Sequence, residues 1–158
     1  MKGRRTDLSQ NACAASRALE VVGDWWSLLI VRDALVGMER FSEFQKSIGL
    51  AKNILSSRLR KLVDGGVLQL VPDDAAPNRH RYLLTDKGKA LAVVITAIWQ
   101  WGEENCFEPG ESVPLLIDKA SEQPLAKLEI KTTDGRVVEP RDLQMGLVER
   151  RASAPADA

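Results

Sequence analysis

Histidine and cysteine are scarce in this chain of 158 residues, which holds one histidine, His80, and two cysteines, Cys13 and Cys106. These three side chains cannot complete a tetrahedral metal site unless carboxylates or a second chain contribute, and their spacing matches no zinc-binding pattern. The sequence also contains no phosphate-binding glycine loop, no GxSxG turn and no HExxH motif. We therefore expect no metal, no cofactor and no enzymatic activity.

Long apolar runs are absent as well. No stretch approaches the roughly 18 apolar residues that span a bilayer. The N-terminal sequence MKGRRTDLSQ turns polar where a signal peptide would turn apolar. These features predict a soluble cytoplasmic protein whose thiols are reduced at rest.

The net charge is zero, so global charge predicts no partner, but the charge is unevenly distributed. Residues 1–106 hold 15 basic and 12 acidic residues, whereas residues 107–158 hold 7 and 10. The window from Arg40 to Lys61 contains six basic residues and a single acid, Glu43. Such a basic window is typical of a surface that binds nucleic acid.

Helix signals fill the first half of the chain after a polar arm at residues 1–10. Asn11 can cap a helix that Gly23 ends. Asp24 can cap a very apolar helix, which we expect at the centre of the core. Ser42 can cap a short helix that Gly49 ends.

The next helix, at about residues 51–64, has two contrasting faces. Its apolar residues recur at helical spacing: Leu55, Leu59, Leu62 and Val63. The opposite side is small, polar and basic: Asn53, Ser57, Arg60, Lys61 and Asp64, with Lys52 and Ser56 at the margins. The sequence therefore predicts a helix that packs by one face and presents the other.

After this helix the spacing of apolar residues changes from helical to alternating. Residues 67–71 and 79–85 alternate in the manner of strands around a loop rich in proline and acid, which predicts a β-hairpin, or wing, at about residues 72–82. The last helix, at about residues 87–106, is apolar on nearly all sides. Such a helix needs two buried faces, and a symmetric partner is the economical source of the second.

The composition shifts after Cys106. We expect residues 11–106 to form the main domain and residues 150–158 a disordered tail. Between them, residues 107–149 form a small C-terminal extension, with an antiparallel β unit at residues 113–140 and a hairpin turn at residues 133–136. The predicted fold class is mainly α with a small β component.

A short helix, a tight turn, a basic helix and a β-hairpin, in that order, describe a winged helix-turn-helix. In this fold the second helix enters the DNA major groove and the wing touches the adjacent backbone. Asn53, Ser57 and Arg60 suit hydrogen bonding to base edges. Lys52, Arg58 and Lys61 could neutralise phosphates, although Arg58 lies further round the helix and could instead form a salt bridge.

Three segments carry a family resemblance: CAASRALEVVGDWWSLLIVRDAL, RFSEFQKSIGLAKNILSSRLRKLVDGGVL and RYLLTDKGKAL. Together they resemble the HxlR-type bacterial transcription regulators, relatives of the MarR group. The resemblance covers residues 13 to about 106 and thins out beyond them.

This resemblance implies a homodimeric winged helix-turn-helix regulator that joins its partner through the first and last helices and binds inverted-repeat operators on double-stranded DNA. Carried over position by position, the DNA-contacting residues would be Arg40, Lys52, Asn53, Ser56, Ser57, Arg60, Arg79, His80 and Arg81. Asp73 and Asp74 weaken the wing assignments, because they repel phosphate unless they point away.

The resemblance also makes Cys13 a candidate redox sensor, since several members carry an oxidant-sensing cysteine in the first helix. A place near a helix N-terminus favours the thiolate, yet a small cysteine among alanines is also a good core residue. The four tryptophans could line a pocket for a small-molecule effector, but core and dimer packing explain them more simply. A winged-helix module that binds another protein and no DNA is the alternative function.

Overall fold

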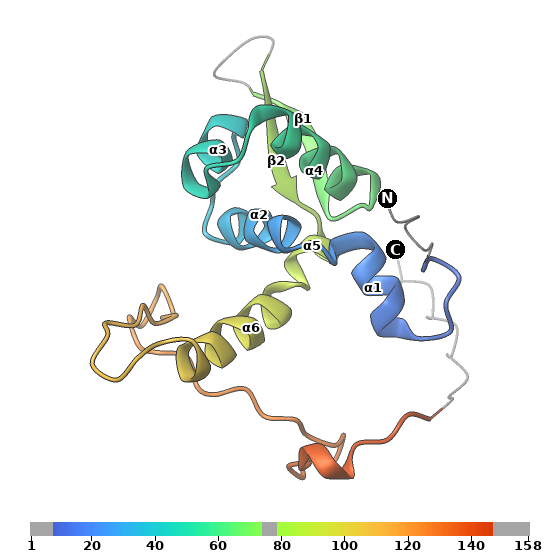
Figure 1. Ribbon diagram of the computed structural model, residues 1–158, viewed down its shortest axis with the longest axis vertical. Coiled ribbons are helices and arrows are strands. Elements are labelled where there is room, and N and C mark those ends of the chain that lie inside the picture. The colour runs from blue at the N-terminus through green and yellow to red at the C-terminus, as the bar shows by residue number, and fades with distance from the viewer. Residues whose placement is uncertain (1–7, 74–78, 147–158) are drawn as a thin grey trace. The chain divides into compact units, whose positions relative to one another are not determined.

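The computed structural model describes residues 8–73 and 79–146, which are mainly helical and form one two-stranded antiparallel sheet (Figure 1). In chain order the elements are α1 (Ala14–Val22), α2 (Trp25–Leu35), α3 (Phe41–Ile48), α4 (Lys52–Asp64), β1 (Leu68–Pro72), β2 (His80–Leu84), α5 (Asp86–Lys89), α6 (Ala92–Asn105) and the 3-10 helix η1 (Pro140–Asp142). Residues 1–7 of the predicted arm and the predicted tail lie outside the described residues.

The chain forms two compact units, one ending at Pro124 and one beginning at Leu125. The first unit holds every α-helix and strand named above, and the second holds η1. Residues 107–124, which the sequence grouped with the extension, belong to the first unit. The indole Nε1 of Trp99 on α6 donates to the carbonyl oxygen of Pro114 at 2.9 Å, which ties this segment to the helices.

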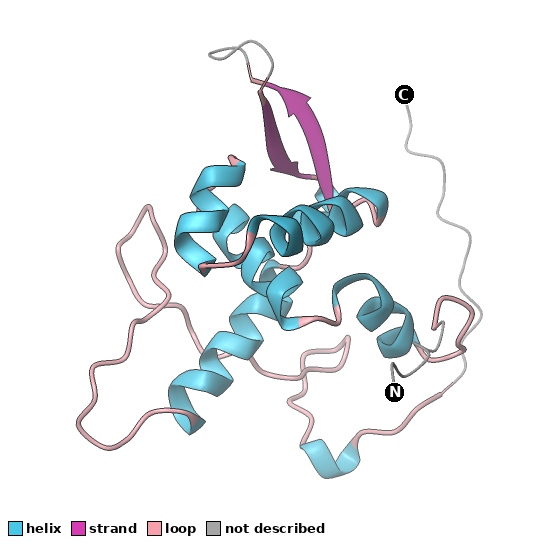
Figure 2. Ribbon diagram, turned by 45° about the horizontal axis from the view of Figure 1, so that its top comes forward, coloured by secondary structure: helices cyan, strands magenta, loops and turns pink. Residues whose placement is uncertain are grey.

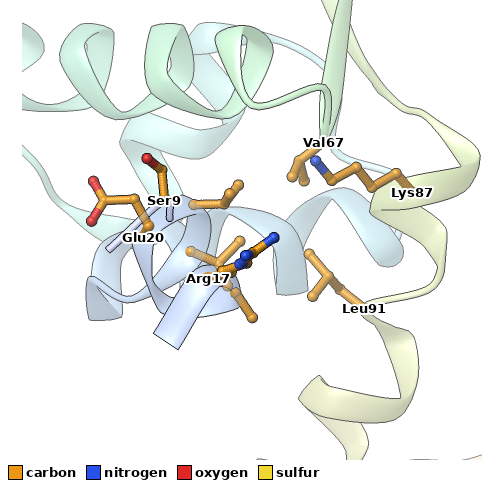
Figure 3. Close-up of a pocket in the computed structure, with 9 residues that line it drawn as sticks. Ser9, Arg17, Glu20, Val67, Lys87 and Leu91 are labelled. Atoms are coloured by element: carbon orange, nitrogen blue, oxygen red, sulfur yellow. The ribbon is translucent and has the colours of Figure 1, made fainter. Parts of the chain in front are cut away.

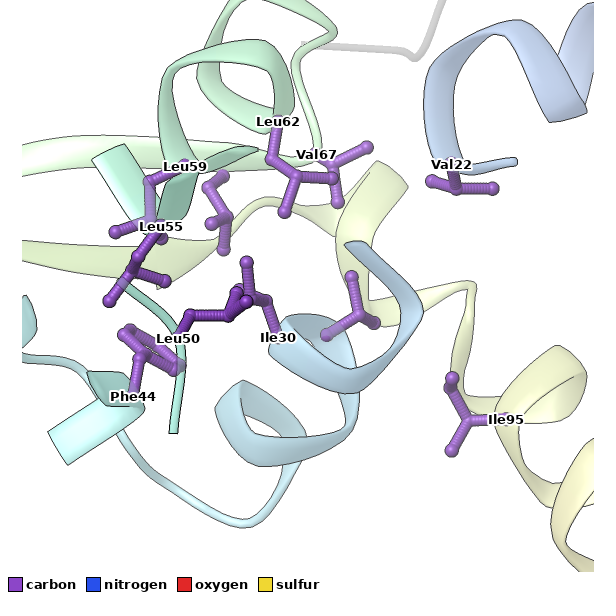
Figure 4. Close-up of a cluster of buried hydrophobic side chains, with 11 residues drawn as sticks. Val22, Ile30, Phe44, Leu50, Leu55, Leu59, Leu62, Val67 and Ile95 are labelled. Atoms are coloured by element: carbon purple, nitrogen blue, oxygen red, sulfur yellow. The ribbon is translucent and has the colours of Figure 1, made fainter. Parts of the chain in front are cut away.

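One hydrophobic core organises the first unit. Its buried residues are Val22, Ile30, Val31, Phe44, Leu50, Leu55, Leu59, Leu62, Val67, Leu68 and Ile95. Figure 4 shows the α4 leucines pointing toward Ile30 of α2 and Phe44 of α3, with Val22 and Ile95 at the margins. α2 therefore lies at the centre of the unit, as its composition predicts.

Helix boundaries follow local chemistry, with two corrections. Asp24 caps α2 as predicted, accepting from the Ser27 amide at 3.0 Å. The third helix begins at Phe41 with Arg40 at the N-cap, so the prediction that Ser42 caps it is wrong. The Glu43 carboxylate accepts a hydrogen bond from the Arg40 amide at 2.8 Å, which fixes Arg40 as the N-cap residue. The prediction that Asn11 caps α1 is also wrong, because Cys13 occupies the N-cap position.

β1 and β2 form the predicted wing. They pair antiparallel in a register that sets Leu68 opposite Leu84, Leu70 opposite Tyr82 and Pro72 opposite His80. Figure 2 shows both strands projecting beyond the helices. Tyr82 and Leu84 pack against the buried core.

The long helix predicted at residues 87–106 is divided into α5 and α6. Thr85 caps α5 by accepting from the Gly88 amide at 3.1 Å. The chain then tightens at the turn between the helices, where the Leu91 amide donates to the Gly88 carbonyl at 3.0 Å. Among the described helices, none is long and apolar enough to cross a membrane.

The C-terminal extension contains the predicted turn but no continuous strands within its described residues. Gly135 adopts φ +89°, and an isolated antiparallel bridge pairs Lys131 with Val137. A second bridge pairs Ile117 with Pro124. The alternation of apolar and polar residues does not produce a sheet here. No described residue between 107 and 146 is buried, so the apolar face of such a sheet would have nothing to pack against.

Candidate nucleic-acid interface

α4 presents the face that its periodicity predicts. Leu55, Leu59 and Leu62 are completely buried. The five residues expected to contact DNA from this helix are all exposed: Lys52, Asn53, Ser56, Ser57 and Arg60. The buried stripe holds the helix rigidly against α2 and α3, so the polar face is presented in a fixed orientation.

Two basic residues of α4 point back into the protein. The Arg58 Nε lies 3.2 Å from Asp24 Oδ1, and the Lys61 Nζ lies 3.8 Å from Asp24 Oδ2. Both side chains are mostly buried, with 30% and 22% of their area exposed. Of the two roles left open for Arg58, the structure shows the salt bridge. The phosphate role predicted for Lys61 is not favoured, since its charge is directed to the α2 N-cap.

Two of the DNA contacts predicted outside α4 form ion pairs, Arg40 at the turn and Arg81 in the wing. Arg40 Nε donates to Asp73 Oδ2 at 2.9 Å, and Arg81 Nη1 donates to Glu39 Oε2 at 3.0 Å. Arg79 and His80 are exposed, and 45% of the Arg40 side chain is exposed as well. The wing is therefore fastened to the turn between α2 and α3 by two ion pairs.

The charge expected to repel phosphate is neutralised in this arrangement. Asp73 is buried, with 6% of its area exposed, and it faces the Arg40 guanidinium. The hydrogen bond that Arg40 donates to Asp73, together with the negative charge of Asp73, raises the pKa of Arg40 further above its ordinary value. Asp74 lies outside the described residues.

Tyr82 joins the wing to both helices of the motif. Its ring packs edge-on against Phe44 of α3, with the centroids 6.4 Å apart and the planes at 76°. Burial raises the pKa of the Tyr82 phenol, and the positive charge of Arg60 on α4 opposes that rise. α4 also packs against β1, so both helices of the motif contact the wing.

Cys13 is exposed at the N-cap of α1 and is not the core residue that its alanine neighbours also allowed. The Ser16 amide, the Ser16 hydroxyl and the Ala15 amide favour the thiolate and lower the pKa of Cys13. Cys106, at the end of α6, is also an exposed free thiol.

A pocket lies beside α1, next to the start of β1 and α5 (Figure 3). Val21, Val67 and Leu91 contribute apolar walls, and Arg17 and Lys87 contribute cations. The Lys87 ammonium donates to the Gly65 carbonyl at 2.7 Å, so that charge is already satisfied within the chain.

The tryptophans do not gather in a single pocket. Trp26 packs beside the buried core, whereas Trp25 and Trp101 are 67% and 63% exposed. Trp25 and Trp99 line an apolar hollow between α2 and α6. Trp25 and Trp101 therefore do not belong to the core of this chain.

Sequence reasoning missed the acidic residues that organise this surface. Asp24, Glu39 and Asp73 fix α4 and both strands of the wing, yet the sequence identifies Asp24 only as a helix cap and Asp73 only as a repulsive charge. Their basic partners are distant in the sequence, and no local sequence pattern predicts such pairs.

Comparisons with known proteins agree with this geometry. The HTH-type transcriptional regulator Rv3095 of Mycobacterium tuberculosis is 44% identical over 96 residues, which are 61% of this chain and 61% of that protein. The match therefore spans about three fifths of the relative's length. The crystal structure of PA1607, described as a candidate transcription factor, covers 89% of this chain and 99% of its own, with 47% identity and a TM-score of 0.84.

A third similar protein is the redox regulator HypR in its oxidized form, with 26% identity and a TM-score of 0.55 over 59% of this chain and 97% of its own. A family model described as HxlR-like helix-turn-helix matches residues 21–109, more than half of the chain. The resemblance found in the sequence is thus confirmed, and the chain belongs to the HxlR-like helix-turn-helix family of transcription regulators.

Proposed function

We propose that this chain is a sequence-specific DNA-binding regulator that places α4 in the major groove and the wing on the adjacent backbone. The observation that carries the proposal is the α4 face itself: small, polar and basic side chains stand exposed over a fully buried leucine stripe. A groove lined by phosphates and base edges requires those properties.

The positions suggest distinct roles. Asn53, Ser57 and Arg60 read base edges, and Ser56 lets the helix approach closely. Lys52, at the first turn of α4, contacts a phosphate, where the helix N-terminus also favours an anion. Arg79 and His80, exposed at the start of β2, reach the neighbouring backbone.

Arg60→Ala is expected to weaken binding to the operator by about 1–3 kcal/mol, because a guanidinium paired with guanine is lost. Binding to unrelated duplexes should change little. The measurement is a fluorescence-anisotropy titration on a duplex located by footprinting the region upstream of the coding sequence. Equal losses on all sequences would reassign Arg60 to a phosphate.

Lys52→Ala is the matched control for that experiment. It removes one cation from the same helix face, and it should weaken binding to all duplexes alike. The slope of log K against log salt should fall by about 0.9 for the lost phosphate contact.

We also propose that the protein acts as a homodimer through α1 and α6 on inverted-repeat operators. On α6, Val94, Ile98 and Trp101 recur at helical spacing and are 43%, 48% and 63% exposed. Leu19 of α1 is 54% exposed. Exposed apolar residues of this kind are typical of a subunit interface.

A redox response through Cys13 is a further part of the proposal. Its lowered pKa and exposure favour reaction with oxidants and electrophiles. We expect Cys13 in a Cys106→Ser variant to be alkylated faster near neutral pH than Cys106 in a Cys13→Ser variant. Oxidant should change the DNA affinity of the parent protein and leave that of the Cys13→Ser variant unchanged. If the affinity of both proteins is unchanged, the redox hypothesis is wrong.

The alternative function is a protein-interaction module, favoured by the exposed apolar residues of the extension, such as Leu128 and Ile130. It predicts a purified dimer that retards no duplex at low salt. Catalysis is not proposed, because Cys13, at the N-cap of α1, and His80, on β2, lie on separate elements.

A further inference from the structure

An acidic residue occupies the edge of the proposed DNA surface. Asp73 directly follows β1, at the end from which the wing loop departs, and its side chain is 3% exposed. Taken alone, an acid at such a place costs affinity for DNA, since it repels phosphate. The structure pairs it with Arg40, whose Nε donates to Asp73 Oδ2 at 2.9 Å.

This pair connects the start of α3 to the end of β1. On one side, the Arg40 backbone is fixed at the start of α3, because the Glu43 carboxylate accepts the amides of Glu39 and Arg40, both at 2.8 Å. On the other side, the Asp73 amide donates to the Arg79 carbonyl at 2.9 Å. A short path of hydrogen bonds thus runs from α3 through Arg40 and Asp73 to Arg79.

A second attachment holds the other strand. Arg81 on β2 pairs with Glu39, and the Tyr82 amide donates to the Glu39 carbonyl at 2.7 Å. The Arg81 attachment keeps β2 against the turn between α2 and α3. The Arg40–Asp73 pair holds the end of β1, from which the wing loop departs.

We propose that Arg40 and Asp73 are positioning residues, which hold the wing where Arg79 and His80 meet the DNA backbone beside the groove occupied by α4. Asp73 therefore tightens DNA binding, although its charge has the same sign as the phosphates. Arg40 acts through Asp73 and does not itself read DNA. This inference rests on the proposed DNA-binding function.

The direction in which Asp73→Asn changes the affinity for DNA tests the proposal. Asp73→Asn removes a negative charge, so electrostatics without positioning predicts tighter binding to any duplex. We expect the opposite: Asp73→Asn and Arg40→Ala should each weaken binding to a promoter duplex by roughly tenfold, with little further loss in the double variant. Asp64→Asn is the matched control, because Asp64 is exposed at the end of α4, and this change should leave binding unchanged or slightly tighter.

The effect of Arg79→Ala gives a readout that general destabilisation would not produce. In the parent background this change should weaken binding, whereas in the Asp73→Asn background it should have almost no effect, because the wing no longer delivers Arg79 to the backbone. The proposal is overturned if Asp73→Asn tightens binding as Asp64→Asn does, or if Arg79→Ala costs the same in both backgrounds.

Hydrogen exchange in the free protein separates this proposal from the proposed function. Arg40→Ala should accelerate exchange of the Asp73 amide and leave the amide of buried Ile30 protected, while Lys52→Ala should change neither. A parent protein that binds no duplex would refute the proposed function. Unchanged exchange at Asp73 in Arg40→Ala would refute the positioning role independently of DNA.

Discussion

Phe44→Ala is expected to lower the free energy of unfolding by about 3–5 kcal/mol, the range for truncating a fully buried phenylalanine. Phe44 is completely buried on α3, among core residues contributed by α2 and α4. Its removal leaves a cavity where the helices of the motif meet, and the surrounding backbone can close only part of it. Chemical denaturation followed by circular dichroism measures the loss.

The same substitution should also loosen the wing, because Tyr82 loses the ring against which it packs edge-on. Phe107→Ala provides the control: Phe107 is 42% exposed, and removal of its ring should change stability by only about 0.5 kcal/mol. A loss at Phe44 no larger than that at Phe107 would mean that α3 does not depend on this ring for its place in the core.

The helix that carries the proposed DNA contacts could be predicted closely from the sequence. Its leucines recur at helical spacing, and Gly65 and Gly66 follow directly, so the expected range 51–64 agrees with Lys52–Asp64. Asp24 and Gly49 are equally local signals, an N-cap and a left-handed residue with φ +74°. Features decided within one or two turns of chain are readable in this way.

The contacts that orient the wing could not be predicted, because they depend on which distant charges meet. Arg40 and Asp73 are 33 residues apart, and Arg81 and Glu39 are 42 residues apart. Each of these four residues is of a charged type that is usually exposed. Only the folded chain brings the two members of each pair together. Treated singly, Arg40 resembles a DNA contact and Asp73 resembles an obstacle to one.

The extension shows the opposite failure, in which a clear local pattern lacks tertiary support. Alternating apolar and polar residues at 125–131 predict a strand, yet the chain forms only one isolated bridge around the Gly135 turn. Leu125, Leu128 and Ile130 are 42–50% exposed. A strand becomes stable when its apolar face is covered, and the pattern alone does not provide a cover.

Ile98→Glu is expected to dissociate the proposed dimer. Ile98 lies midway along the exposed apolar stripe of α6, one turn from both Val94 and Trp101. A carboxylate buried there without a partner costs about 3–5 kcal/mol, and two-fold symmetry places two of them in one interface. Sedimentation velocity should show monomers at concentrations where the parent is dimeric.

Folding of the monomer should survive this change, because glutamate is a good helix former and the side chain is 48% exposed within one chain. Val36→Glu makes the same substitution at a residue that is 70% exposed beyond the end of α2, and it should leave the dimer intact. A monomeric Ile98→Glu protein should also bind an inverted-repeat duplex far more weakly than the parent, because the second half-site no longer adds its contacts. If both variants remain dimeric, the subunit interface does not include this face of α6.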